Sequence, residues 1–437
     1  MLTVLDQTHP LFDQKLKELL HRSEALSHSV DEVVRNIIDQ VREEGDKALV
    51  ELTQRFDGVD ACTVEQLEIP NEELGASLLS LNPISREALE SAAHRIREYH
   101  QQEVLQSWQF SQPDGTILGQ RVTPLDRVGL YVPGGKAAYP SSVLMTAIPA
   151  KVAGVKEIIV TVPTLGGQIN QMVLAAAALA GVDRVFRVGG AQAIAALAYG
   201  TETIPRVDKI VGPGNIYVAT AKKMVFGKVG IDMIAGPSEV VVICDESASP
   251  DWVAMDLFAQ AEHDELAQAI AITDSPHMVK AINQSITKLL PTMERKEIIE
   301  KALSEQGAII LAESLQAAAE LSDRIAPEHL ELMVSEPRKI LPSITHAGAI
   351  FLGKHSAESL GDYCAGPSHV LPTSGTARFS SPLGVYDYQK RSSVIEISAA
   401  GVGEIASIAS ILARSEGLTA HARSAEYRKT AQWNPSE

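Results

Sequence analysis

The chain has 437 residues, too many for one ordinary hydrophobic core, so we expect at least two domains. Its 38 basic and 55 acidic residues give a formal net charge of −17. An acidic surface repels phosphate groups, so neither nucleic acid nor a membrane surface is an expected partner. The chain starts without the basic flank and apolar run of a signal peptide, and no stretch reaches the ~18 apolar residues that span a bilayer. The three cysteines form no CxxC motif and no disulfide framework, which favours the reducing cytoplasm.

Residues 1–120 are predicted to form a helical N-terminal region. A capping-box pattern at Ser29-Val-Asp-Glu32 opens a helix whose apolar residues recur at helical spacing up to Gly45. Further helices are expected over about 46–56 and 85–101. We interpret this region as packing and subunit contacts, because no chemical motif stands out in it.

Residues 121–238 are predicted to form a first Rossmann-like domain, because short β-branched runs alternate there with alanine-rich helical segments. Strands are expected over 157–162, 184–188 and 209–211, and helices over 171–181, over 191–199 and from about 215.

The same alternation restarts over residues 239–355, which predicts a second Rossmann-like domain with a parallel sheet. Its expected strands are 239–244, 269–273, 308–311, 329–334 and 349–352, and its expected helices lie near 250–263, 278–290 and 315–324. The fold class is therefore α/β. Residues 356–437 are expected to supply site loops over 356–392 and a helical tail over about 403–427.

The segment Ala259-Gln-Ala-Glu-His-Asp264 closes a predicted helix. Gln260 and His263 are three residues apart, so both side chains can face one point. An amide oxygen and an imidazole nitrogen can both ligate a metal ion. A histidine at a helix end is also typical of a dipole-stabilised cap, and this segment alone leaves both interpretations open.

The segment Ile325-Ala-Pro-Glu-His-Leu330 places an acidic residue beside an imidazole at the start of a predicted strand. Pro327 ends the preceding helix. Glu328 and His329 could act as acid and base near neutral pH. An exposed ion pair without a chemical role is the other interpretation.

The segment Ser359-Leu-Gly-Asp-Tyr-Cys-Ala-Gly-Pro-Ser-His369 predicts a tight loop that presents Asp362 and His369 inward. Asp362 is a candidate hard oxygen ligand. Cys364 is an alternative zinc ligand, although no partner cysteine lies nearby. A fourth segment, Arg414-Ser-Glu-Gly-Leu-Thr-Ala-His421, stops one helix and starts another, and His421 is either a ligand or a residue of the new helix's first turn.

Three glycine-rich turns are candidates for phosphate binding. Tyr131-Val-Pro-Gly-Gly-Lys136 lacks the nucleoside-triphosphatase spacing, which would need glycine where Leu130 stands. Val188-Gly-Gly-Ala-Gln192 and Val211-Gly-Pro-Gly-Asn215 each follow a strand and open a helix, where backbone N–H groups suit a pyrophosphate. Neither is GxGxxG followed by an acidic residue about 20 positions later, so spacing alone leaves dinucleotide binding open.

Taken together, these segments resemble the histidinol dehydrogenase family, with the weakest coverage over residues 1–120. The match runs in order through Tyr131-Val-Pro-Gly-Gly, Val188-Gly-Gly-Ala-Gln-Ala-Ile194, Val211-Gly-Pro-Gly-Asn215, Ile231-Asp-Met-Ile-Ala-Gly-Pro-Ser-Glu239, Gln260-Ala-Glu-His263, Ala326-Pro-Glu-His-Leu330, Gly361-Asp362, Gly366-Pro-Ser-His369 and Glu416-Gly-Leu-Thr-Ala-His421.

The resemblance implies a homodimeric, NAD-dependent enzyme that oxidises L-histidinol to L-histidine through histidinaldehyde, with two NAD per turnover. It is the last step of histidine biosynthesis. The resemblance implies one Zn²⁺ per subunit and shared active sites. The residue roles that it implies are Gln260, His263, Asp362 and His421 for zinc, Glu328 and His329 for acid–base chemistry, Tyr131, Gln192 and Asn215 for NAD, and Ser238, His369 and Glu416 for substrate, which would also contact His329 and the zinc ligands.

Two other functions stay open at this point. One is NAD-dependent oxidation of another small alcohol, such as a sulfonated diol, by a relative of this family. The other is zinc-dependent hydrolysis in which Glu328 activates water without hydride transfer. A binding protein without catalysis is disfavoured, because the acid–base pair and the metal ligands are all present. Cys364 is expected to pack, since no step needs a thiol nucleophile.

Overall fold

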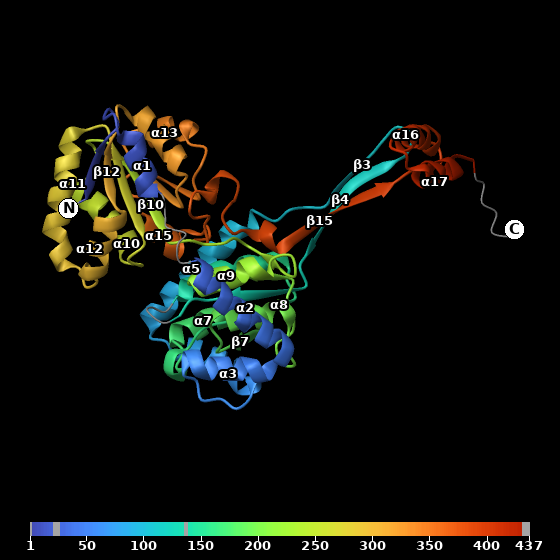
Figure 1. Ribbon diagram of the computed structural model, residues 1–437, viewed down its shortest axis with the longest axis horizontal. Helices are drawn as coiled ribbons and strands as arrows, with labels where there is room; N and C mark the ends of the chain where they lie inside the picture. The colour runs from blue at the N-terminus through green and yellow to red at the C-terminus, as the bar shows by residue number, and fades with distance from the viewer. Residues whose placement is uncertain (1, 21–26, 135–138, 431–437) are drawn as a thin grey trace. The chain divides into compact units, whose positions relative to one another are not determined.

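A computed structural model of the chain describes residues 2–20, 27–134 and 139–430. Contacts divide the chain into two compact units (Figure 1). The first unit consists of Met1–Val104 and Leu125–Tyr388, and the second consists of Leu105–Pro124 and Gln389–Glu437. Among the described residues, no helix is long and apolar enough to cross a membrane.

The first unit contains two six-stranded sheets. One sheet has the order β2-β7-β6-β5-β8-β9, and all its pairs are parallel except the short β2–β7 pair. Its strands are β2 (Glu68–Ile69), β5 (Arg127–Tyr131), β6 (Glu157–Thr161), β7 (Arg184–Phe186), β8 (Lys209–Val211) and β9 (Gly230–Ile231).

Helices cover both faces of this sheet. Successive residues of a strand point to opposite faces, so both faces carry apolar side chains that need covering. Val128 and Leu130 of β5 pack in one core, and Tyr131 packs in the other. The first core includes α4 (Asn71–Ser80), α5 (Pro83–Gln101), α6 (Pro140–Ala153) and α7 (Gln171–Ala180). The second core includes α2 (Ser27–Glu44), α3 (Asp46–Asp57), α8 (Gly190–Tyr199) and α9 (Ile216–Val225).

The other sheet has the order β1-β12-β11-β10-β13-β14 and is parallel throughout. Its strands are β1 (Thr3–Asp6), β10 (Glu239–Cys244), β11 (Gln268–Thr273), β12 (Ala308–Leu311), β13 (His329–Met333) and β14 (Ala349–Leu352). Helices α10 (Pro250–Ala261), α11 (Pro276–Leu289) and α12 (Lys296–Gln306) pack on one face, and α1 (Phe12–Leu20) and α13 (Leu315–Ile325) pack on the other. The short α14 (Pro337–Ile340) follows β13.

The structure confirms the α/β class and the two parallel-sheet domains. Several predicted strands have the observed bounds, among them 239–244, 308–311 and 349–352. The central strand β5 was not predicted, because Gly129 and the residues around it give no β-branched run. Gly129 is required by close packing: a Cβ there would lie 2.8 Å from Cδ1 of Leu197.

The helical prediction for residues 1–120 is wrong in part. β1 lies at the edge of the second sheet and pairs with β12, which follows it by some 300 residues, so local spacing could not reveal it. A domain boundary at residue 121 would also cut through β4 (Ile117–Pro124). Likewise, the predicted loop region 356–392 ends inside a strand, because β15 (Gln389–Glu396) pairs with β4.

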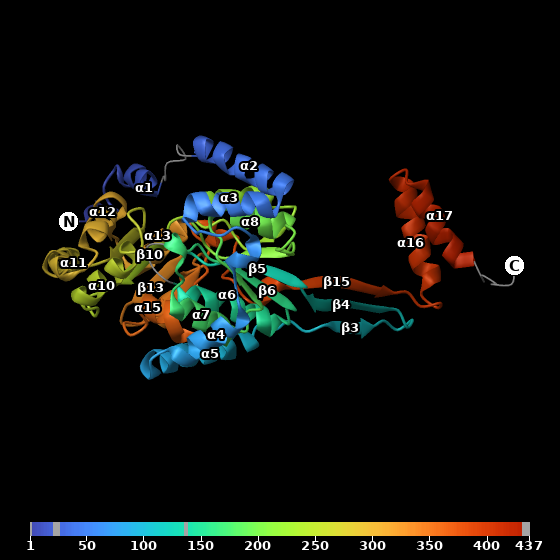
Figure 2. The same cartoon turned by 90° about the horizontal axis from the view of Figure 1, so that it is seen from below.

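The second unit is an antiparallel ribbon with a helical hairpin (Figure 2). Its strands have the order β15-β4-β3, where β3 spans Trp108–Ser111. The predicted tail forms α16 (Val402–Ser415) and α17 (Thr419–Thr430), interrupted where the Glu416-Gly417 stop signal lies. Arg414 and Glu426 join the two helices by an ion pair of 2.8 Å.

Candidate active site

Several of the predicted site residues lie on the side of the second sheet where its parallel strands begin. In a parallel sheet, each crossover helix runs back from the end of one strand to the start of the next. The carboxyl end of α10 therefore brings Gln260 to the side of the sheet where β10 and β11 begin, and its Nε2 lies 3.3 Å from Nδ1 of His329. The start of β13 lies beside β10, with His329 opposite Val240.

Gln260 and His263 form the first pair of side chains in the site. Gln260 is fully buried in the last turn of α10, and His263 lies two residues past the helix end. Nδ1 of His263 lies 2.9 Å from Oε1 of Gln260. Burial lowers the pKa of His263, which favours the neutral imidazole that metal ions bind.

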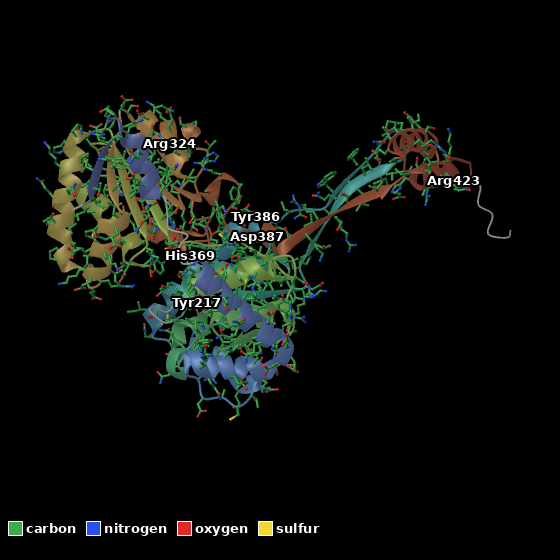
Figure 3. All side chains as sticks on the ribbon, in the orientation of Figure 1. Tyr217, Arg324, His369, Tyr386, Asp387 and Arg423 are labelled. Atoms are coloured by element: carbon green, nitrogen blue, oxygen red, sulfur yellow. The ribbon has the colours of Figure 1, made fainter. Side chains whose placement is uncertain are left out.

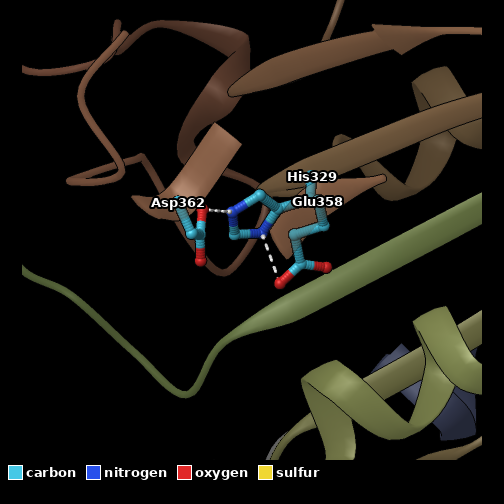
Figure 4. A group of neighbouring side chains, drawn as sticks. All are labelled: His329, Glu358 and Asp362. Carbon is cyan, nitrogen blue, oxygen red and sulfur yellow. Dashed lines mark ion pairs between the residues drawn. The ribbon is translucent and has the colours of Figure 1, made fainter. Parts of the chain in front are cut away.

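Asp362 approaches His329 from the segment after β14. The short helix α15 (Glu358–Leu360) continues into one π-helical turn over Gly361–Ala365, a conformation found often at functional sites. This turn places Oδ1 of Asp362 3.3 Å from Nε2 of His329, as Figure 4 shows. Burial acts to raise the pKa of Asp362, but the hydrogen bond and charge of His329 lower it below its usual value.

His329 is held in a defined orientation by the neighbouring strand. A carbonyl oxygen only accepts hydrogen bonds, so Nδ1 of His329 donates to the carbonyl of Glu239 at 3.1 Å. This leaves Nε2 facing Asp362, with no other hydrogen-bond partner among the described residues. Burial opposes the charged imidazole, but the carboxylates of Glu358, Glu328 and Asp362 outweigh burial and hold the pKa of His329 well above its usual value.

Glu328 is also buried, so the interpretation of Glu328 and His329 as an exposed ion pair is wrong. Their exposed fractions are 6% and 3%. Oε2 of Glu328 accepts the backbone N–H of Glu239 at 2.9 Å, and burial raises the pKa of Glu328 to about 8. α13 ends before Pro327 as predicted, and Ala326 has a left-handed conformation with φ 54°, which is uncommon for a residue with a side chain.

Glu358 is a site residue that sequence reasoning missed. One of its carboxylate oxygens lies 4.0 Å from Nδ1 of His329 (Figure 4). Its backbone N–H donates to Oε1 of Glu331 at 2.6 Å. Burial raises the pKa of Glu358 to about 8. The residue directly precedes the loop motif that begins at Ser359, and no spacing rule distinguishes it from a surface carboxylate.

His369 extends the site toward the first sheet. His369 is labelled in Figure 3. Its Nδ1 contacts the backbone oxygen of Asp362 at 2.9 Å, and its Nε2 lies 3.2 Å from Oγ of Ser142 in α6. Burial lowers the pKa of His369. Ser142 was also missed, because it lies 227 residues before His369 and no motif marks it.

The buried donors suit a metal ion. His329, Glu358 and Asp362 form a group whose ligand atoms lie within 4.8 Å of one another. Gln260 and His263 add an amide oxygen and an imidazole nitrogen next to this group. Such a set of nitrogen and oxygen donors fits zinc. Two other residues were predicted as possible ligands. Cys364 packs against the apolar core, and His421 lies in the second unit.

The residues predicted to bind NAD lie where strands of the first sheet end, which is the usual place for ligands in such sheets. The Tyr131 hydroxyl accepts the backbone N–H of Gly190 at 3.1 Å, and burial raises the Tyr131 pKa to about 12. Gln192 is buried, and its Nε2 lacks a hydrogen-bond partner within the described part of the chain. Asn215 caps α9 through its side-chain oxygen, which leaves its amide nitrogen as a donor. Gly135 and Lys136 of the first glycine-rich turn lie outside the described residues.

Three further predicted site residues lie outside the contacts described so far. Ser238 is half-buried directly before β10, and its backbone oxygen accepts the N–H of Gln268. Glu416 and His421 belong to the second unit, where both are exposed.

Comparisons with known proteins agree on one family. The model of the family described as histidinol dehydrogenase matches residues 20–429. The chain is 61% identical over 428 residues to a histidinol dehydrogenase of Pseudomonas putida, covering 98% of this chain and 97% of that protein. A histidinol dehydrogenase of Nitrosospira multiformis is 60% identical over 419 residues, with 96% and 95% covered. The crystal structure of histidinol dehydrogenase from Elizabethkingia anophelis is similar with a TM-score of 0.92 at 33% identity, covering 98% of both chains.

The raised pKa of Glu328 can be measured without turnover. In metal-stripped protein, a carboxylic acid band in the infrared difference spectrum should persist at neutral pH and disappear as the pH rises through about 8. Glu328→Gln should remove this band, and Glu358→Gln should remove a second one. The assignment is wrong if the band lost in Glu328→Gln titrates in the ordinary range of an exposed carboxyl group.

Proposed function

Because the chain belongs to the histidinol dehydrogenase family, an oxidoreductase family of histidine biosynthesis, we propose that it oxidises L-histidinol to L-histidine through histidinaldehyde with two NAD and one zinc ion per subunit. The observation that carries the proposal is the buried contact of the Glu328–His329 pair with Asp362 and Gln260. This contact puts an acid–base pair next to a set of metal ligands, which matches the needs of a dehydrogenase that must hold and deprotonate a polar alcohol.

Zinc would be bound by Gln260, His263, Asp362 and His421. When bound, it supplies a docking point for the imidazole and amine of histidinol, and so orients the substrate. Ser238, His369 and Glu416 would contact the substrate. Tyr131, Gln192 and Asn215 would contact NAD, which accepts one hydride in each oxidation.

His329 would move the proton in the first oxidation. The nearby carboxylates favour the charged imidazole, whereas this step needs the neutral form of His329. In that form Nδ1–H is committed to the carbonyl of Glu239, and Nε2 is the atom that takes the hydroxyl proton as hydride leaves the same carbon. The products of this step are the aldehyde and NADH. Burial of the pair keeps water away from the aldehyde except where Glu328 presents it.

Glu328 would start the second oxidation. One of its oxygens is held by the Glu239 N–H, and the other can take a proton from water as that water attacks the aldehyde carbon. His329 would return the proton from the first oxidation to the carbonyl oxygen as the hydrate forms. Its Nε2 would then take a proton from the hydrate as the second hydride leaves. The carboxylate of L-histidine and a second NADH are formed.

Two alternatives differ in measurable ways. A dehydrogenase of another small alcohol would form NADH with that alcohol and not with histidinol. A zinc hydrolase would form no NADH with any alcohol. The buried position of His329 at the start of β13 favours a dehydrogenase over the hydrolase, because hydrolysis needs no base for an alcohol proton. The family to which the chain belongs favours histidinol over another small alcohol.

We propose further that two chains form a homodimer with shared active sites, in which His421 and Glu416 complete the site of the partner subunit. Support comes from the second unit itself, which carries both residues on an exposed surface. α16 exposes Ile408, Ile411 and Leu412, with 52%, 69% and 57% of their surfaces accessible. Apolar side chains grouped this way are typical of a surface that another chain covers.

Two single variants should distinguish the role of a metal ligand from that of the acid–base pair. His263→Ala removes a zinc ligand and should abolish tight zinc binding, measured by metal analysis after dialysis, while circular dichroism stays unchanged. His329→Ala should keep zinc and lose NADH formation with histidinol by ~10²–10⁴-fold, the range for a general base. The roles are wrongly assigned if His329→Ala releases the metal and His263→Ala retains it.

Mixed dimers test whether the sites are shared. Inactive His263→Ala and inactive His421→Ala chains are unfolded together in equal amounts and refolded. If His421 acts across the interface, each mixed dimer has one site with both lesions and one with neither. About a quarter of wild-type activity should return, because half of the dimers are mixed and each has one intact site of two. If no activity returns while refolded wild type recovers, His421 serves its own subunit.

A further inference from the structure

A buried ion pair lies beneath the turn between β8 and α9. Lys222 of α9 contacts Asp232, which follows β9, and the two side chains are 2% and 1% exposed. Both also bind one backbone residue. Nζ of Lys222 donates to the carbonyl of Gly212 at 2.8 Å, and Oδ2 of Asp232 accepts the N–H of Gly212 at 2.8 Å. The two side chains together therefore bind both the carbonyl and the N–H of Gly212.

Only glycine fits at position 212. Its φ is +114°, and a Cβ would lie 2.1 Å from the carbonyl oxygen of Tyr131. Gly214 is similarly tight, with 2.4 Å from a built Cβ to Cγ1 of Val218. The turn is therefore pressed against the end of β5 and leads within three residues to Asn215.

We propose that Lys222 and Asp232 are positioning residues for the cofactor, which hold the 212–215 turn so that Tyr131 and Asn215 keep the spacing needed to contact NAD. This inference rests on the proposed use of NAD. Neither residue contacts the cofactor itself, because both side chains are buried beneath the turn.

Stabilisation of the fold does not by itself explain why a buried ion pair is present here. Replacing a buried ion pair by apolar side chains of similar size is often neutral or stabilising, whereas removing one partner leaves an uncompensated charge. A fold that needed only packing at this place could use methionine in place of Lys222. Methionine cannot reproduce the hydrogen bond that Nζ of Lys222 donates to the carbonyl of Gly212.

The test measures KM and kcat of the zinc-loaded enzyme for NAD and for histidinol. Lys222→Met should raise KM for NAD about tenfold, the scale expected when one charged hydrogen bond is lost, and leave kcat, KM for histidinol and zinc content near wild type.

The control is Lys151→Met. Lys151 pairs with Asp183 at 2.8 Å, and Asp183 also accepts a backbone N–H, from Ile158 at 2.7 Å, but this pair lies where strands of the same sheet begin. Lys151→Met should leave KM for NAD unchanged.

A second variant keeps the test decisive if Lys222→Met folds poorly. The charge-neutral Lys222→Met/Asp232→Asn variant leaves no single buried charge and should fold. Its KM for NAD should rise about tenfold, as expected for Lys222→Met, because the two residues act as one unit. An unchanged KM for NAD in a folded variant overturns the inference, and so does an equal loss in every kinetic constant. If the wild-type enzyme forms no NADH with histidinol, the proposed function fails separately, and calorimetric titration of wild type and both variants with NAD decides the inference.

Discussion

The orientation of the His329 imidazole is the constraint on which the proposed chemistry depends. Parallel pairing of β10 and β13 puts the backbone of Glu239 beside His329, and its carbonyl fixes the proton on Nδ1. The backbone N–H of the same residue holds the Glu328 carboxylate. One strand register therefore positions both members of the acid–base pair, and a slip of one residue would turn both away.

Features with short sequence spacing could be predicted well. Gln260 and His263 are three residues apart and meet at the end of α10, and Glu328 and His329 are adjacent at the start of β13. The bounds predicted for β10 to β14 of the second sheet were also accurate, because each of these strands is a short apolar run between longer helical segments. The roles of all the predicted site residues, in metal, substrate and NAD binding and in acid–base chemistry, remain predictions from resemblance.

Features created by distant contacts could not be predicted. Ser142 meets His369 across 227 residues, and Glu358 becomes a site residue only because its short helix packs beside His329. α6 escaped prediction for another reason: nearly every residue in it is buried, so it has no polar face and no helical periodicity. Burial also decided between the alternatives for Glu328, since no pattern in the sequence separates a buried acid–base pair from an exposed one.

The central claim is that a single acid–base pair at one site carries out both oxidations. The most direct test counts the NADH formed from limiting L-histidinol with excess NAD, while an aldehyde-trapping hydrazine reports any intermediate that leaves the site. The account predicts two NADH for each histidinol, with L-histidine as the product and no trapped aldehyde. A yield of one NADH, with histidinaldehyde captured in solution, would contradict it.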